Sequence, residues 1–136
     1  MQTADSSLLS GLKVLVIDDK PEGLDVTKSM LSFYHAEVIP CLTAAEGLEQ
    51  VQEHKPDVIV CDINMPQVNG YEFIQAVRNL PADKGGETPA IALSVLDKGE
   101  AGAKAIKAGF QEYLCKPVRL LTLIGTVAGA AGRQPR

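Results

Sequence analysis

Asp57-Val58-Ile59-Val60-Cys61-Asp62-Ile63-Asn64-Met65-Pro66 is the stretch that decides the fold. It begins with a continuous apolar, mostly β-branched run, which is typical of a strand covered on both faces in a parallel α/β sheet. The run ends in a carboxylate, Asp62, and a turn with Pro66 follows. Because open α/β sheets bind ligands at the carboxyl ends of their strands, Asp62 is the first candidate for a functional residue. The alternative for an isolated aspartate here is a turn or a helix N-cap.

Further apolar runs alternate with segments that carry apolar residues at helical spacing. The predicted strands are 13–17, 37–41, 57–62, 90–94 and 112–116, and the predicted helices are 22–35, 43–54, 71–79, 97–108 and 119–131. This alternation predicts a parallel sheet with helices on both faces. Pro40 cannot donate to a strand ladder, so its strand belongs at a sheet edge. Right-handed crossovers then favour a flavodoxin-like (βα)5 doubly wound sheet with strand order 2-1-3-4-5.

The whole chain of 136 residues fits one domain. We expect a flexible leader over residues 1–11, the domain itself over 12–131 and a frayed tail over 132–136. A net charge of −4 argues against direct binding to nucleic acid or to an anionic membrane. No apolar run approaches the ~20 residues that span a bilayer, and the N-terminus lacks a signal-peptide pattern. We therefore expect a cytoplasmic protein without membrane contact.

The predicted helix over residues 22–35 carries apolar residues at helical spacing. Val26, Met30 and Phe33 are expected to share a face, with Leu24 and Leu31 beside them.

In the predicted strand order the first and third strands are neighbours, about 4.8 Å apart. Asp18, Asp19 and Asp62 then share one pocket at the strand ends. Three carboxylates this close repel one another unless a cation lies among them. Oxygen ligands on a water-accessible rim favour a hard cation, most plausibly Mg²⁺, and a backbone carbonyl just past Asp62, that of Asn64, can complete the protein ligands.

The fourth and fifth strands bring Ser94 and Lys116 to the same edge. A metal, a lysine and a hydroxyl around one carboxylate form a suitable cradle for a transferring phosphoryl group. No histidine, cysteine or extra acid is positioned as a general base, so Asp62 is the expected nucleophile. A lone serine or lysine at a strand end is usually a solvated loop residue, but the convergence of all these positions argues against that interpretation.

With these residues the chain resembles the receiver domain of two-component signalling from about Leu12 to Val127. The matching positions are the acidic pair Asp18-Asp19, Asp62 in Asp-Ile-Asn-Met-Pro, Asn69-Gly70, Ser94 in Ala-Leu-Ser and Lys116 in Lys-Pro. The resemblance implies that Asp62 accepts a phosphoryl group from a phosphohistidine on a histidine kinase or a histidine phosphotransfer domain. It also implies Mg²⁺ held by Asp18 or Asp19, by Asp62 and by the Asn64 carbonyl.

The resemblance further implies a conformational switch and a cis peptide bond at Lys116-Pro117. Ser94 would move toward the acyl phosphate while Tyr113, three residues before the lysine, swings inward. That motion would reshape the face made by the fourth helix, the fifth strand and the fifth helix. Such a domain is not an enzyme with an external substrate, because it catalyses only its own phosphorylation and dephosphorylation.

Two positions depart from the family pattern. Val95 stands where a small residue is usual, and we expect its bulk to narrow access to the acyl phosphate. Lys20 follows the acidic pair, and three interpretations are open: it weakens Mg²⁺ binding, it helps to anchor phosphate, or it is simply solvated.

Alternatives to a phosphoryl-accepting receiver remain at this point. A haloacid-dehalogenase-type phosphatase also uses an aspartyl nucleophile, but it needs that residue on the first strand with a second aspartate two residues later. A degenerate receiver that only binds a partner is disfavoured because every phosphorylation position is filled. The sequence also leaves open whether the chain is a stand-alone regulator or the receiver of a hybrid histidine kinase, and whether its last two helices form a weak homodimer.

Overall fold

The computed structural model describes residues 7–63, 69–95 and 98–133. The strands and helices are β1 (Lys13–Ile17), α1 (Pro21–Phe33), β2 (Glu37–Cys41), α2 (Ala44–His54), β3 (Val58–Asp62), α3 (Gly70–Arg78), η1 (Ala82–Lys84), β4 (Ala90–Ser94), α4 (Lys98–Ala108), β5 (Glu112–Cys115) and α5 (Leu120–Ala130). The strands form one parallel sheet in the order β2-β1-β3-β4-β5. The predicted flavodoxin-like architecture is therefore confirmed, including the edge position of the strand that contains Pro40.

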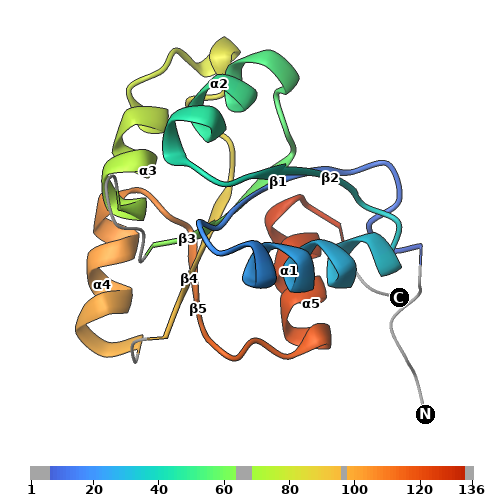
Figure 1. Ribbon diagram of the computed structural model, residues 1–136. Coiled ribbons are helices and arrows are strands. Elements are labelled where there is room, and N and C mark those ends of the chain that lie inside the picture. The colour runs from blue at the N-terminus through green and yellow to red at the C-terminus, as the bar shows by residue number, and fades with distance from the viewer. Residues whose placement is uncertain (1–6, 64–68, 96–97, 134–136) are drawn as a thin grey trace.

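The helices cover the sheet in two layers, with α1 and α5 on one face and α2, α3 and α4 on the other (Figure 1). Successive residues of β1 and β3 alternate between two apolar cores: Leu15 and Ile59 join the core under α2, α3 and α4, whereas Val14 and Val58 join the core under α1 and α5. All residues of β3 are buried. A strand that is covered on both sides needs no polar alternation, which explains its continuous apolar sequence.

The apolar residues of α1 fall into a buried set and an exposed set. Leu24, Thr27 and Leu31 are buried, whereas Val26 and Phe33 are 55% and 66% exposed. The spacing i, i+3, i+7 places the buried three on one side of the helix, opposite Val26 and Phe33. The prediction that Leu24 and Leu31 lie beside Val26 and Phe33 was therefore wrong, since the helix has apolar residues on both sides.

The predicted flexible leader is also wrong where the structure describes it. Leu9 is fully buried in the core under α1 and α5, and its backbone N–H donates to the Tyr34 carbonyl at 3.3 Å. Arg133 Nη1, in the predicted tail, donates to the carbonyl of Leu8 at 3.0 Å. Leu9 and Arg133, near the two limits of the described residues, thus both bond to this layer. None of the helices in the described ranges is long and apolar enough to cross a membrane.

Candidate functional site

Three carboxylates meet at the carboxyl ends of β1 and β3. Asp18 and Asp19 follow β1, and Asp62 is the last residue of β3. The strands pair in parallel with Ile17 opposite Cys61, which brings the next residue of each strand to the same level. One oxygen of each carboxylate lies within 4.8 Å of the others. The structure therefore brings together the acidic residues that the sequence placed in one pocket.

Two of these acids are almost completely buried. Asp18 is 3% and Asp62 is 2% exposed. Asp18 is fixed through its backbone, since its N–H donates to the Cys41 carbonyl at 3.1 Å, and through its side chain, which accepts from the Lys20 N–H at 2.9 Å. Buried carboxylates are costly unless they are paired with a cation or hydrogen-bonded. The positive groups around them are therefore essential to the site.

Lys116, just after β5, provides one of these positive groups. Its Nζ lies 3.5 Å from Asp18 Oδ2 and 3.5 Å from Asp62 Oδ2. Its backbone N–H donates to the Ser94 carbonyl at 2.7 Å, which fixes the start of the lysine side chain next to β4. The peptide bond from Lys116 to Pro117 is cis, as expected.

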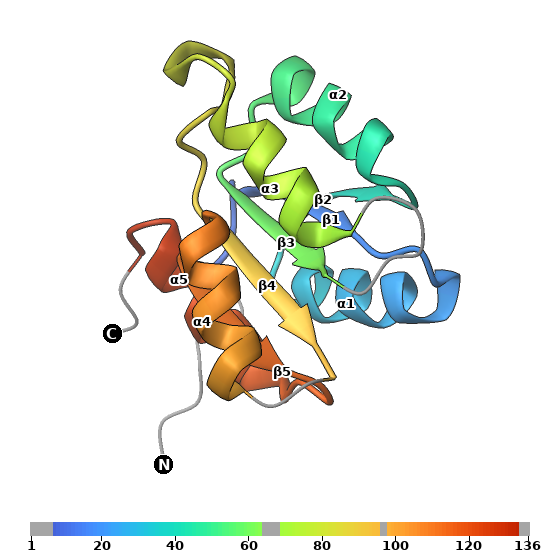
Figure 2. The same ribbon diagram turned by 90° about the vertical axis from the view of Figure 1, so that its left-hand side faces the viewer.

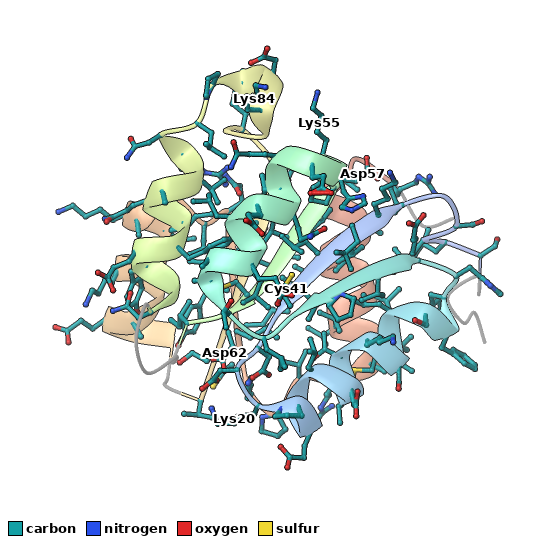
Figure 3. The ribbon with its side chains drawn as sticks, turned by 45° about the horizontal axis from the view of Figure 1, so that its top comes forward. Lys20, Cys41, Lys55, Asp57, Asp62 and Lys84 are labelled. Atoms are coloured by element: carbon teal, nitrogen blue, oxygen red, sulfur yellow. The ribbon has the colours of Figure 1, made fainter. Side chains whose placement is uncertain are left out.

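Lys20 provides a second positive group, for which the sequence left three alternative roles open. Its Nζ lies 3.4 Å from Asp19 Oδ1 and 3.8 Å from Asp62 Oδ2. The negative charges of Asp19, which has the larger effect, and of Asp62 raise the pKa of the Lys20 ammonium above its ordinary value. Figure 3 shows Lys20 and Asp62 at the same end of the molecule, whereas Lys55, Asp57 and Lys84 lie at the opposite end. Lys20 is thus part of the acidic pocket.

Ser94 ends β4 beside this pocket and is completely buried. The strands β3 and β4 lie side by side in the sheet (Figure 2). Asp62 pairs with Leu93 across their ladder, so Ser94 extends one residue beyond the aspartate. Tyr113, on β5, is 6% exposed and belongs to the core under α3 and α4. Burial, followed by the proximity of Tyr113, raises the pKa of Tyr71 on α3. Tyr113, which was expected to swing inward, is therefore already buried in this structure.

Residues 14–128 match the family model described as the response regulator receiver domain. The chain belongs to this family. The acidic pocket therefore belongs to a receiver domain of the kind found in two-component response regulators.

Relatives of this receiver differ greatly in length. The chain is 39% identical over 119 residues to an uncharacterized 14.6 kDa protein of Leptolyngbya boryana, and the match covers 88% of this chain and 89% of that protein. It is 35% identical to the two-component response regulator ARR11 of Arabidopsis thaliana over 83% of this chain, but over only 21% of ARR11. Among solved structures, the chemotaxis protein CheY4 of Vibrio cholerae superposes with a TM-score of 0.80 at 29% identity, covering 88% of this chain and 98% of that one.

The donor set of the receiver pocket fits a hard divalent cation. Asp18, Asp19 and Asp62 offer oxygens close enough to share one ion, and Mg²⁺ is held in proteins by one or two carboxylates together with water. Asn64, the expected backbone ligand, lies outside the described residues. Its contribution stays a prediction.

Sequence reasoning missed the cap at the start of α3 (Gly70–Arg78). Asn69 Oδ1 accepts from the Glu72 N–H at 3.0 Å, and Glu72 Oε1 accepts from the Asn69 N–H at 3.3 Å, which is a complete capping box at the start of α3. The spacing Asn-x-x-Glu was the available signal. Gly70 follows, and a Cβ there would lie 2.6 Å from the Ile63 backbone. The glycine lets α3 start directly against the residue after Asp62.

An apolar pocket of about 490 Å³ adjoins the acidic one. It lies between α1, the end of β4 and the segment that follows β5. Its lining includes Val26, Met30, Val95, Lys116 and Pro117. Val26 and Val95 are 55% and 66% exposed. Lys116 therefore separates a charged site from an exposed apolar surface.

Proposed function

We propose that this receiver accepts a phosphoryl group on Asp62 from a phosphohistidine of a histidine kinase or a histidine phosphotransfer domain. The observation that carries the proposal is the environment of Asp62: a carboxylate 2% exposed, with Lys116 Nζ at 3.5 Å and two further carboxylates sharing the pocket. A buried carboxylate beside a fixed cation is a suitable nucleophile for phosphoryl transfer.

In the proposed reaction, an Asp62 oxygen attacks the phosphorus and the phosphorus–nitrogen bond of the phosphohistidine breaks. The imidazole leaves with the electron pair and takes a proton from solvent. Lys116 is already within ion-pair distance of the attacking carboxylate, so its charge can offset the negative charge on the transferred oxygens. Ser94, at the end of the adjacent strand, is the proposed hydroxyl donor to that group.

Asp18 and Asp19 would hold Mg²⁺ together with Asp62. When bound, this ion would neutralise charge on the phosphoryl oxygens during transfer. The proposal is supported by the three carboxylates that share the pocket, since acids this close favour a cation between them.

The phosphorylated state would be passed on through Ser94 and Tyr113 to the surface of α4, β5 and α5. Tyr113 belongs to the same core as Ala105 of α4, so a change at the end of β4 would reach α4 through this core. Because the tyrosine is buried already, we propose that phosphorylation narrows its range of positions rather than moving it inward from the surface.

Intact-mass measurement after incubation with acetyl phosphate and Mg²⁺ tests the proposal. We expect one added phosphate on the wild-type chain and none on Asp62→Asn. Asp57→Asn is the matched control, since Asp57 lies at the other end of β3 and accepts a backbone hydrogen bond from Lys13 that asparagine can keep. Turnover of unrelated phosphate esters, or a phosphate that persists in Asp62→Asn, would contradict the proposal.

A further inference from the structure

The ammonium of Lys20 lies beside two of the carboxylates that would bind the metal ion. It contacts Asp19 Oδ1 at 3.4 Å and Asp62 Oδ2 at 3.8 Å, and both residues belong to the cluster of three carboxylates. Figure 3 shows that the two labelled side chains, Lys20 and Asp62, come from different elements and meet at one end of the molecule. A second cation is thus present in the pocket besides Lys116.

The backbone of Lys20 is held in this place by the start of α1. Lys20 is the N-cap residue of the helix, with φ −101° and ψ 115°, and Pro21 follows it. Its N–H donates to Asp18 Oδ1 at 2.9 Å. The backbone of Lys20 is therefore bonded to one acid of the pocket, while its side chain contacts the other two.

Together the two lysines form ion pairs with all three acids, and both contact Asp62. Lys116 contacts Asp18 and Asp62, Lys20 contacts Asp19 and Asp62, and so each carboxylate has at least one ammonium within 4 Å. The lysines differ in freedom, because the Lys116 side chain is 25% exposed and that of Lys20 is 60% exposed. Lys20 can leave the pocket for solvent at little cost, since its long stem is flexible.

We propose that Lys20 is a tethered counter-cation of the metal-free pocket, which a divalent cation must displace in order to bind. The inference rests on the proposed function, because it takes the same three acids as the metal site. A divalent ion and the Lys20 ammonium would both bind the carboxylates of Asp19 and Asp62, and two cations only a few ångströms apart repel each other. Lys20 therefore lowers the affinity of the pocket for Mg²⁺ and protects the acids from mutual repulsion when Mg²⁺ is absent.

Titration calorimetry with MgCl₂ alone tests the competition. Lys20→Met keeps an unbranched stem of similar length, removes the charge and adds no oxygen ligand. In this variant we expect the Kd for Mg²⁺ to fall by roughly threefold to tenfold, the size of effect expected for the loss of one or two ion pairs. Lys20→Arg should keep the weaker, wild-type affinity. Lys84→Met is the matched control, since Lys84 is exposed and lies at the opposite end of the molecule. Equal Kd values for the wild type and Lys20→Met would overturn the inference.

Thermal unfolding gives a second readout that does not depend on phosphorylation. In EDTA, Lys20→Met should have a lower Tm than the wild type, because three acids lose one of their two counter-charges. At saturating Mg²⁺ the difference should close, since Lys20 has by then left the pocket in the wild type. A Tm difference that is the same with and without Mg²⁺ would contradict displacement.

The acetyl phosphate assay separates the two proposals. If the wild type is phosphorylated on Asp62 while Lys20→Met binds Mg²⁺ no more tightly, the inference on Lys20 is wrong and the proposed function stands. If neither the wild type nor Lys20→Met binds Mg²⁺, the metal site is wrong and the inference is overturned with it.

Discussion

Gly23, in the first turn of α1, lies so close to Asp18 that a Cβ at position 23 would be 2.5 Å from Asp18 Oδ2. The same oxygen lies 3.5 Å from Lys116 Nζ. Asp18 is 3% exposed, so it has little room to move aside. A glycine inside a helix costs stability relative to alanine. Its value here is the space that it leaves for the pairing of Asp18 with Lys116.

Gly23→Ala should therefore weaken Mg²⁺ binding at the proposed site. We expect the Kd for Mg²⁺ to rise roughly tenfold, the effect typical of losing a group that positions a ligand. Titration calorimetry measures this directly. The matched control is Gly125→Ala in α5, where a Cβ would meet nothing within 4 Å. This variant should keep the Mg²⁺ affinity, and its free energy of unfolding in urea should rise by up to ~1 kcal/mol. An unchanged Kd in Gly23→Ala would show that Asp18 tolerates the displacement.

Arg78 joins three segments at the end of the molecule away from the acidic pocket. Its guanidinium donates to the carbonyls of Gly109, Gly86 and Thr88 at 3.0, 3.0 and 2.7 Å, and to Gln111 Oε1 at 3.0 Å. Arg78→Ala should lower the free energy of unfolding in urea by about 2–3 kcal/mol, because partly buried carbonyls lose charge-assisted bonds. Arg78→Lys should rescue little of it, since one ammonium cannot reach all four acceptors.

Arg119→Ala serves as the control for Arg78. Arg119 is exposed, and its side chain makes no capping hydrogen bond to α5. Its removal should change the free energy of unfolding by less than about 0.5 kcal/mol. Equal losses in the two variants would mean that the hydrogen bonds of Arg78 contribute no more than an ordinary surface charge.

The sequence predicted the sheet and the meeting of the acids because both follow from strand order. Continuous apolar strands have few arrangements, and adjacent parallel strands deliver their last residues to one edge. The buried face of α1 was not predictable in the same way: Leu24 and Val26 are both apolar, and only packing decides between them. The contacts of Lys20 and Arg78 depend on side-chain conformation, which strand order does not determine.

The buried cysteines predict a loss of stability at alkaline pH. Burial, which has the larger effect, and the negative charge of Glu46 raise the pKa of the Cys41 thiol from 9.0 to about 12. Between these values the folded state keeps the proton that the unfolded state has lost, so the free energy of unfolding falls as pH rises from 9 toward 12. Urea unfolding at several pH values should show a slope of less than about 1.4 kcal/mol per pH unit from this group.

Cys41→Ala should reduce that slope, although Cys61, whose pKa burial raises well above its ordinary value, leaves part of it. In the folded wild type at pH 8, a thiol reagent should modify the exposed Cys115 and spare the buried Cys41 and Cys61. An alkaline slope of the same size in Cys41→Ala would assign the effect to other groups.

Val95 offers a test of how long the phosphate lasts. It is 66% exposed and lines the apolar pocket beside Lys116. If its bulk limits access of water, Val95→Ala should shorten the lifetime of the phosphorylated form by roughly twofold to fivefold, which corresponds to a barrier change of up to about 1 kcal/mol. The decay is followed by intact mass after removal of acetyl phosphate.

Val26→Ala is the comparison for Val95. Val26 is a similarly exposed valine that lines the same pocket from α1, and we expect its loss to leave the decay rate unchanged. Equal rates in the wild type and Val95→Ala would rule out a role for Val95 in limiting access.

The most direct test of the account is to identify the residue that carries the phosphate. Hydride reduction of an aspartyl phosphate converts that residue to homoserine, which peptide mass spectrometry can locate. After treatment of the wild-type chain with acetyl phosphate and Mg²⁺, we predict homoserine at position 62 and unmodified aspartate at positions 18 and 19. Homoserine at 18 or 19, or a phosphorylated chain that resists reduction, would contradict the assignment of Asp62 as the acceptor.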